Sequence, residues 1–165
     1  MAKVTFWEGT DAPDYFANSS SSDITLMTSF AGNDTLINDK SGVWINAGTD
    51  NNIVSLSATG NNTVIAGGGK DIVNVAEANG ARYNNFISIS GGNNLINNSN
   101  ILQSKIYAGK GSDTIITGGY YTSIKAGNGN NRISVTTADG HNSIVAGTGK
   151  DYVTINGSSG NNYIN

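Results

Sequence analysis

The sequence predicts an all-β protein, a parallel β-roll or β-solenoid with two short strands per coil. Apolar residues recur about every nine positions, glycine and asparagine mark the turns between them, and no helical period is present. Of the 165 residues, 22 are glycine, 25 are asparagine and 1 is proline. These observations predict a single domain over residues 1–165, with about eight coils of about 18 to 20 residues each.

The expected strands are centred on apolar anchors that follow one another along the whole chain. Ile106 and Ile115 lie nine residues apart, and so do Ile124 and Ile133. An insertion over 77–83 lengthens one step to 14 residues. In chain order the anchors are Phe6, Phe16, Met27, Leu36, Ile45, Val54, Val64, Val73, Ile87, Ile96, Ile106, Ile115, Ile124, Ile133, Ile144, Val153 and Ile164.

The residue two positions after an anchor alternates in size from one strand to the next. It faces the same side of the strand as the anchor, because side chains alternate along a strand. In one half of the coil it is alanine, at Ala47, Ala66, Ala108, Ala126 and Ala146. In the other half it is larger, at Leu56, Val75, Val135 and Ile155. We therefore expect two facing sheets whose inward side chains have complementary volumes.

The turns at one edge of the expected roll are rich in glycine. They are clearest in AGGGKDIVNV at 66–75, AGKGSDTIIT at 108–117 and AGTGKDYVTI at 146–155. This pattern resembles the glycine-rich nonapeptide repeats of the bacterial RTX family, which form a parallel β-roll that binds calcium between the turns of successive coils. The resemblance implies a secreted or cell-surface protein with calcium as a cofactor. The implied metal ligands are Asp34, Asp50, Asp71, Asp113, Asp151, Gly69, Gly111 and Gly149.

The chain departs from that family at the position of the repeated aspartate. On the glycine-rich edge this position alternates between Asp and Asn, at Asp34, Asn52, Asp71, Asn94, Asp113, Asn131 and Asp151. Each intercoil site would then hold one carboxylate and one amide, which weakens calcium binding. The alternative is a metal-free ladder of hydrogen bonds. Exposed lysines are expected beside these turns, at Lys70, Lys110 and Lys150.

The opposite edge has no repeated carboxylate. The equivalent positions there are Asn62, Asn85, Ser104, Thr122, Asn142 and Asn162. Asparagine side chains stack and hydrogen-bond from coil to coil, and they tolerate the left-handed backbone of tight turns. We therefore expect an asparagine ladder and no calcium at this edge.

Apolar and aromatic side chains are expected on the outer faces as well. On one sheet they are Trp44, Ile65, Phe86, Tyr107, Val145 and Tyr163. On the other they are Ile53, Ile72, Leu95, Ile116 and Tyr152. A contiguous exposed apolar patch indicates a partner. Two partners fit: a second copy or another domain of a parent protein through the apolar faces, and a glycan on the aromatic side chains.

Several classes of function are disfavoured. The chain has no cysteine, so disulfides and thiolate metal sites are excluded. With 9 Lys and Arg and a net charge of −3, no nucleic-acid partner is expected. The apolar runs are too short for a transmembrane segment. Weak catalytic candidates are His141, Asp139 and Glu77, which leave open a hydrolase acting on esters or polysaccharides. The turn residues are too irregular to favour an ice-binding surface.

The favoured function is a non-catalytic, RTX-like repeat module of structural or adhesive type, stabilised by calcium. The alternative is a glycan-binding accessory module. The sequence ends at Asn165 within an expected strand, and a bare terminal coil exposes its core. We therefore expect either a fragment of a larger protein or an end that another chain caps.

Overall fold

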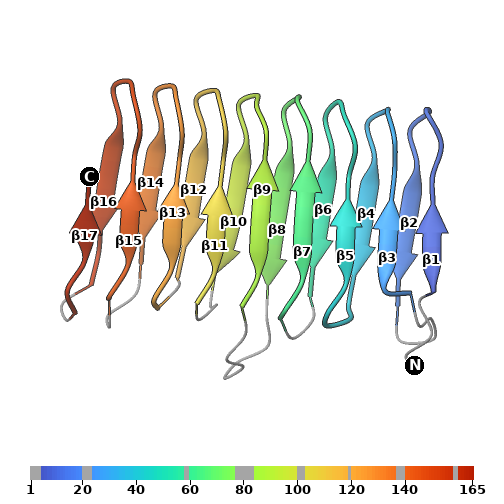
Figure 1. Ribbon diagram of the computed structural model, residues 1–165, viewed down its shortest axis with the longest axis horizontal. Coiled ribbons are helices and arrows are strands. Elements are labelled where there is room, and N and C mark those ends of the chain that lie inside the picture. The colour runs from blue at the N-terminus through green and yellow to red at the C-terminus, as the bar shows by residue number, and fades with distance from the viewer. Residues whose placement is uncertain are drawn as a thin grey trace.

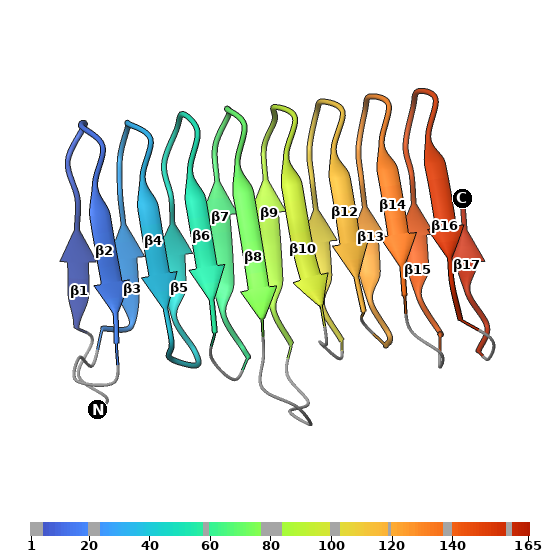
Figure 2. The same ribbon diagram turned by 180° about the vertical axis from the view of Figure 1, so that it is seen from behind.

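The computed structural model describes residues 5–19, 24–57, 60–76, 84–99, 103–118, 120–136, 140–157 and 160–165. These residues form two parallel sheets, and successive strands alternate between them (Figures 1 and 2). Every strand pairs in parallel with the next strand of its own sheet, one coil further along the chain. This topology is a β-solenoid with two strands per coil, which confirms the predicted fold class.

The first sheet holds the odd-numbered strands, in the same order in space as in the chain. They are β1 (Phe6–Glu8), β3 (Leu26–Thr28), β5 (Trp44–Asn46), β7 (Thr63–Ala66), β9 (Phe86–Ile89), β11 (Lys105–Tyr107), β13 (Ser123–Lys125), β15 (Ser143–Val145) and β17 (Tyr163–Ile164). We call it the odd sheet.

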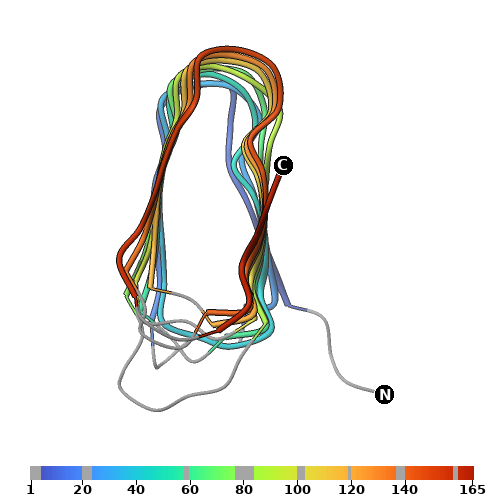
Figure 3. The ribbon, with the colours of Figure 1, turned by 90° about the vertical axis from the view of Figure 1, so that its left-hand side faces the viewer.

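The second sheet, the even sheet, holds the remaining strands. They are β2 (Tyr15–Asn18), β4 (Thr35–Asn38), β6 (Ile53–Leu56), β8 (Ile72–Ala76), β10 (Leu95–Ser99), β12 (Thr114–Thr117), β14 (Arg132–Val135) and β16 (Tyr152–Ile155). Viewed along the long axis, the coils superpose on one flattened outline (Figure 3). The cross-section of the described coils is therefore nearly the same along the whole roll.

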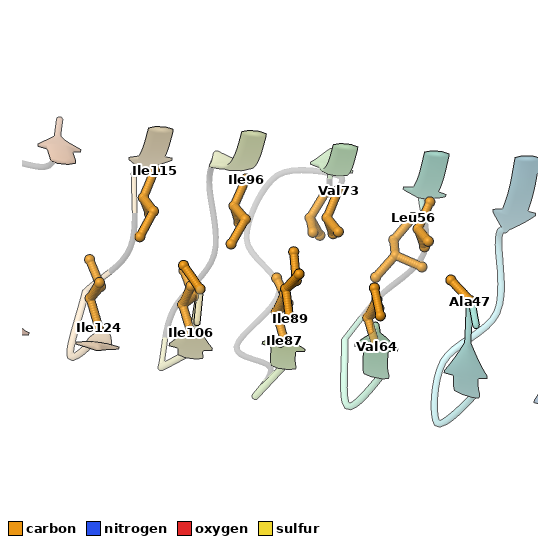
Figure 4. Packing of buried hydrophobic residues seen from close by; sticks show 14 of the residues in the cluster. Ala47, Leu56, Val64, Val73, Ile87, Ile89, Ile96, Ile106, Ile115 and Ile124 are labelled. Atoms are coloured by element: carbon orange, nitrogen blue, oxygen red, sulfur yellow. The ribbon is translucent and has the colours of Figure 1, made fainter. Parts of the chain in front are cut away.

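The register places like residues above one another. Ile87 pairs with Ile106, and Ile106 pairs with Ile124 in the next coil. The same holds on the even sheet, where Val73 pairs with Ile96. The anchors of the two sheets point toward one another across a thin interior (Figure 4). Each fully buried side chain of this size stabilises the fold by about 1.5 to 3 kcal/mol.

The expected alternation of small and large inward residues is present. Ala47, Ala66 and Ala108 on the odd-sheet side are fully buried, and Leu56 and Val75 on the even-sheet side are 1% exposed. In four coils a polar residue takes the larger position: Asn18, Asn38, Asn98 and Thr117. The Asn98 Nδ2 donates to the Thr117 Oγ1 at 3.2 Å, so these polar side chains hydrogen-bond across adjacent coils.

The first anchor was predicted wrongly. Phe6 is 64% exposed, and its neighbour Trp7 takes the inward position, paired with Met27 in the next strand. Trp7 packs against the core and stacks on Phe16, with ring centroids 4.6 Å apart. Trp7 lies nine residues before Phe16 and Phe6 lies ten, and steps of both lengths occur among the anchors, so spacing did not decide between two adjacent aromatic residues.

The outward residues lie where the alternation predicts. Trp44 is 52% exposed and Tyr152 is 58% exposed, on the odd and even sheets respectively. Ile53, Ile72 and Leu95 are direct neighbours across three strands of the even sheet. Within the part of the chain that the structure describes, no helix has the length and apolar character needed to span a membrane.

Candidate functional site

The glycine-rich turns lie at the upper edge in Figure 1, between each odd strand and the following even strand. We call this the glycine edge. The alternating Asp and Asn residues lie at its inner side: Asp71 and Asp113 are 1% exposed and Asn52 is fully buried. Each lies two residues before an even-sheet anchor, so the strand alternation turns its side chain inward. The predicted ligand position therefore belongs to the interior of the roll.

These inward side chains form a continuous ladder, which we call the inner ladder. Each rung accepts a hydrogen bond at its Oδ1 from the backbone N–H of the equivalent rung one coil earlier. For example, the Asn52 N–H donates to Asp71 Oδ1 at 2.9 Å, and the Asp71 N–H donates to Asn94 Oδ1 at 2.9 Å. The donor–acceptor pairs run from Asp14 through Asp34, Asn52, Asp71, Asn94, Asp113 and Asn131 to Asp151, at 2.8 to 3.0 Å. The side chains thus join the coils along the whole edge.

The Asn rungs also tie their own turns together. The Nδ2 of Asn94 donates to the carbonyl oxygens of Gly91 and Gly92, both at 3.3 Å. Asn52 makes the equivalent bonds to the carbonyls of Thr49 and Asp50, both at 3.2 Å. The amide nitrogen therefore satisfies carbonyls that the tight turn leaves pointing inward.

The Asp rungs lack that donor. The Oδ2 atoms of Asp34, Asp71 and Asp113 are buried and have no hydrogen-bond partner. Because Oδ1 accepts the same backbone bond as in the Asn rungs, Oδ2 takes the place of the amide nitrogen. Burial raises the pKa of Asp71 to about 6 and raises the pKa of Asp113, although hydrogen bonds from Asn52 and Asn94 act in the opposite direction. A proton or a cation would satisfy this oxygen.

The other predicted calcium ligands are placed differently. Asp50 is exposed, and its Oδ2 accepts the Gly32 N–H at 3.1 Å. Asp151 is half-buried at the last rung. Gly69, Gly111 and Gly149 have φ values of +130°, +131° and +138°, and a Cβ on any of them would collide with the backbone of the preceding coil. These glycines allow the turns of successive coils to stack closely. The described residues bring no three carboxylate or imidazole groups together.

The opposite edge carries the expected asparagine ladder, but with a gap. The Asn62 N–H donates to Asn85 Oδ1 at 2.9 Å, and the Thr122 N–H donates to Asn142 Oδ1 at 2.8 Å. Between these bonds the rungs are Ser104 and Thr122, whose hydroxyl oxygens are buried and have no hydrogen-bond partner. Their side chains are shorter than asparagine, so the ladder is interrupted there.

A surface hollow of about 540 Å³ adjoins this gap, on the odd sheet beside β9, β11 and β13. We call it the gap hollow. Its lining combines two aromatic rings with amide, hydroxyl and ammonium groups, from Phe86, Tyr121, Gln103, Ser104, Ser123 and Lys105. Tyr121 is 48% exposed and stacks on the imidazole of His141, with centroids 4.9 Å apart and an interplanar angle of 11°.

The turn residues at this edge adopt an unusual backbone conformation. Gln103, Tyr121 and His141 have φ values of +61°, +57° and +69°, at equivalent positions in successive coils. Asn61 has the same conformation, which asparagine adopts easily and larger side chains adopt at a cost of about 1 kcal/mol. Sequence reasoning missed this row, although its place directly before the rungs of this edge at Asn62, Ser104, Thr122 and Asn142 was a usable signal.

The three weak catalytic candidates are not assembled by the described residues. His141 lies in a turn, as expected, and its ring contacts Tyr121 and Tyr120. Asp139 and Glu77 lie outside the described residues. The lysines of the glycine edge, Lys70 and Lys110 among them, are exposed.

Comparison with known proteins adds no assignment. No protein-family model, no curated protein and no solved structure matches the chain. The candidate function therefore depends on the two edges of the roll.

Proposed function

We propose that this chain is a non-catalytic, RTX-like repeat module whose role is structural or adhesive. The observation that carries this proposal is the inner ladder, because its polar side chains bond one coil to the next and all but the two end rungs, Asp14 and Asp151, are buried. A catalytic or recognition edge would instead present those groups to solvent. Uninterrupted stacking of this kind builds a stiff rod, which suits a spacer or a scaffold.

We also propose that calcium stabilises the module through the Asp rungs. The unpartnered Oδ2 atoms of Asp71 and Asp113 fit a hard cation, and the neighbouring turn carbonyls supply ligands of the same type. Bound calcium would supply positive charge to a buried carboxylate whose Oδ2 has no hydrogen-bond partner. One carboxylate per rung predicts weak binding, typical of modules that meet millimolar calcium outside the cell, so we place the protein in a secreted or cell-surface setting.

The test is thermal unfolding in excess EDTA and in 5 mM calcium, at about neutral pH. Wild-type protein should melt several degrees higher in calcium, because an ion that binds only the folded state stabilises it. The double variant Asp71→Asn/Asp113→Asn should lose most of that rise, and the exposed Asp50→Asn should keep it. An equal melting temperature of the wild type in both buffers would refute calcium stabilisation and leave the structural role standing.

The adhesive role would use the outer face of the even sheet. Ile53, Ile72 and Leu95 form an apolar row across β6, β8 and β10, and Ile53 is 39% exposed. Such a row would pack against a second copy or against another domain of a parent protein. The variant Ile72→Thr/Leu95→Thr keeps strand propensity while removing apolar surface. It should lower the mass in solution if a second copy binds there, as sedimentation would show.

A second candidate function is a glycan-binding accessory module. The gap hollow favours it, because exposed aromatic rings beside amide and hydroxyl groups match the apolar faces and hydroxyls of sugars. Retention of the chain on immobilised polysaccharide would test this function without reference to any one site.

A further inference from the structure

We infer that the gap hollow is a binding site for an acidic saccharide unit. This inference rests on the second candidate function and gives it a place and a ligand class. The hollow lies where the asparagine ladder of the opposite edge is interrupted. There, Ser104 and Thr122 replace the asparagine that stands at Asn62, Asn85 and Asn142. The ladder therefore loses two hydrogen-bonding rungs in the coils that line the hollow.

The first supporting observation is that the ladder of the opposite edge is interrupted at a residue that lines the hollow. Ser104 lines the hollow and is 1% exposed, and its hydroxyl oxygen has no hydrogen-bond partner. A buried hydroxyl without a partner costs about 1 to 3 kcal/mol. The unpartnered hydroxyl marks an interruption of the ladder at a residue that lines the hollow.

The second observation is the strained backbone conformation of Tyr121, which lines the hollow. Tyr121 holds φ at +57°, although glycine or asparagine would take this position without cost. Its ring is 48% exposed, so burial in the core does not explain the choice. The stack on His141 fixes the ring at the rim of the hollow. Gln103, at φ +61° in the adjacent coil, lines the same hollow with an amide.

The lining chemistry indicates the ligand class. Phe86 and Tyr121 offer two rings for the apolar face of a pyranose, and Gln103 and Ser123 offer polar partners for its hydroxyls. Among the described residues that line the hollow, Lys105 is the one charged group, and its charge is positive. A carboxylate or sulfate on the sugar would pair with it, so an anionic saccharide should bind more tightly than a neutral one.

The test compares three oligosaccharide probes by titration calorimetry and NMR: a neutral glucan, a polyuronate and a sulfated oligosaccharide. Acidic probes should bind at least about tenfold more tightly than the neutral one. Tyr121→Asn removes the ring and suits the left-handed backbone, so it should keep the fold and lose about tenfold or more in affinity. Lys105→Gln should reduce the preference for acidic probes. Tyr152→Thr, on the even sheet, is the matched control and should bind as wild type.

The outcomes separate the site from the function. Binding that survives unchanged in Tyr121→Asn would overturn the site while leaving a glycan-binding module in place. Equal affinity for neutral and acidic probes would overturn the acidic class. Failure of the wild type to bind any probe, while it is retained on immobilised polysaccharide, would overturn the inference alone. Failure in both assays would overturn the second candidate function as well.

Discussion

The two turn edges of this roll use one structural device with different degrees of regularity. At both edges a side-chain oxygen accepts the backbone N–H of the preceding coil. The glycine edge repeats the device at every coil and closes the turns on one another. The opposite edge interrupts it at Ser104 and Thr122, beside a hollow. The regular edge stacks its turns without a break, and the hollow that we propose as a binding site lies beside the interruption of the other edge.

The largest effect should come from adding a side chain at the glycine edge. Gly111 has φ +131°, and a Cβ there would meet the backbone of Gly92. Gly111→Val should lower the free energy of unfolding by about 3 kcal/mol or more, because neither the conformation nor the space allows it. Chemical denaturation monitored by circular dichroism measures this change.

A matched pair of variants sharpens that prediction: Gly111→Ala at the glycine edge and Gly42→Ala at the opposite edge. Gly42 has φ +71°, but a Cβ there meets nothing within 4 Å. Only the backbone penalty applies, so the loss should be about 1 to 2 kcal/mol. Equal losses for Gly42→Ala and Gly111→Ala would show that stacking of the turns contributes nothing beyond backbone conformation.

The next prediction compares two truncations: one removes a side chain of the inner ladder, and the other removes a side chain where the ladder of the opposite edge is interrupted. Asn94→Ala leaves the Asp71 N–H and the turn carbonyls of Gly91 and Gly92 without partners, so it should cost about 2 to 4 kcal/mol. Ser104→Ala removes a buried hydroxyl that has no partner, so it should cause no loss of stability and should raise the free energy of unfolding by up to about 1 to 3 kcal/mol. Comparable losses at the two sites would contradict the distinction between the edges.

A pH-dependent effect should follow from the unpartnered carboxyl oxygens. The folded-state pKa of Asp71 is about 6, above the ordinary value of 3.8. Between these two pH values the folded chain therefore binds more protons than the unfolded chain. Its free energy of unfolding falls as pH rises from about 4 to about 6. In EDTA at pH 7, Asp71→Asn should raise the free energy of unfolding by about 1 to 3 kcal/mol, because the new amide can donate where a carboxylate cannot.

The control for that prediction is the same substitution at pH 4. Asp71 is then protonated in the folded state and donates as the amide would, so the advantage of Asp71→Asn should shrink toward zero. Denaturation curves of both proteins at pH 4, 5, 6 and 7 measure the trend. An advantage that does not change with pH would rule out the charge of Asp71 as its cause.

Sequence reasoning found the fold because the solenoid is encoded by spacing. The nine-residue step and the alternation of alanine with larger residues gave the strands, the two sheets and the inward faces. Spacing failed at Phe6 and Trp7, where two adjacent aromatic residues compete for one inward position. The recurrence of Asp71 and its equivalents was visible in the sequence, but their unpartnered oxygens depend on hydrogen-bond geometry. The gap hollow depends on side-chain lengths in coils that are about 20 residues apart along the chain.

The smallest predicted effect addresses the strained row at the gap. Gln103 is exposed and holds φ at +61°, a conformation that asparagine adopts more readily. Gln103→Asn should therefore raise the free energy of unfolding by about 0.5 to 1 kcal/mol. Asp50→Asn, at φ +73° on the glycine edge, should change it by less, because aspartate already tolerates this conformation. If Gln103→Asn stabilises the protein while weakening saccharide binding, the strain at this edge is retained for recognition; if it stabilises the protein without affecting binding, the amide of Gln103 has no part in the site.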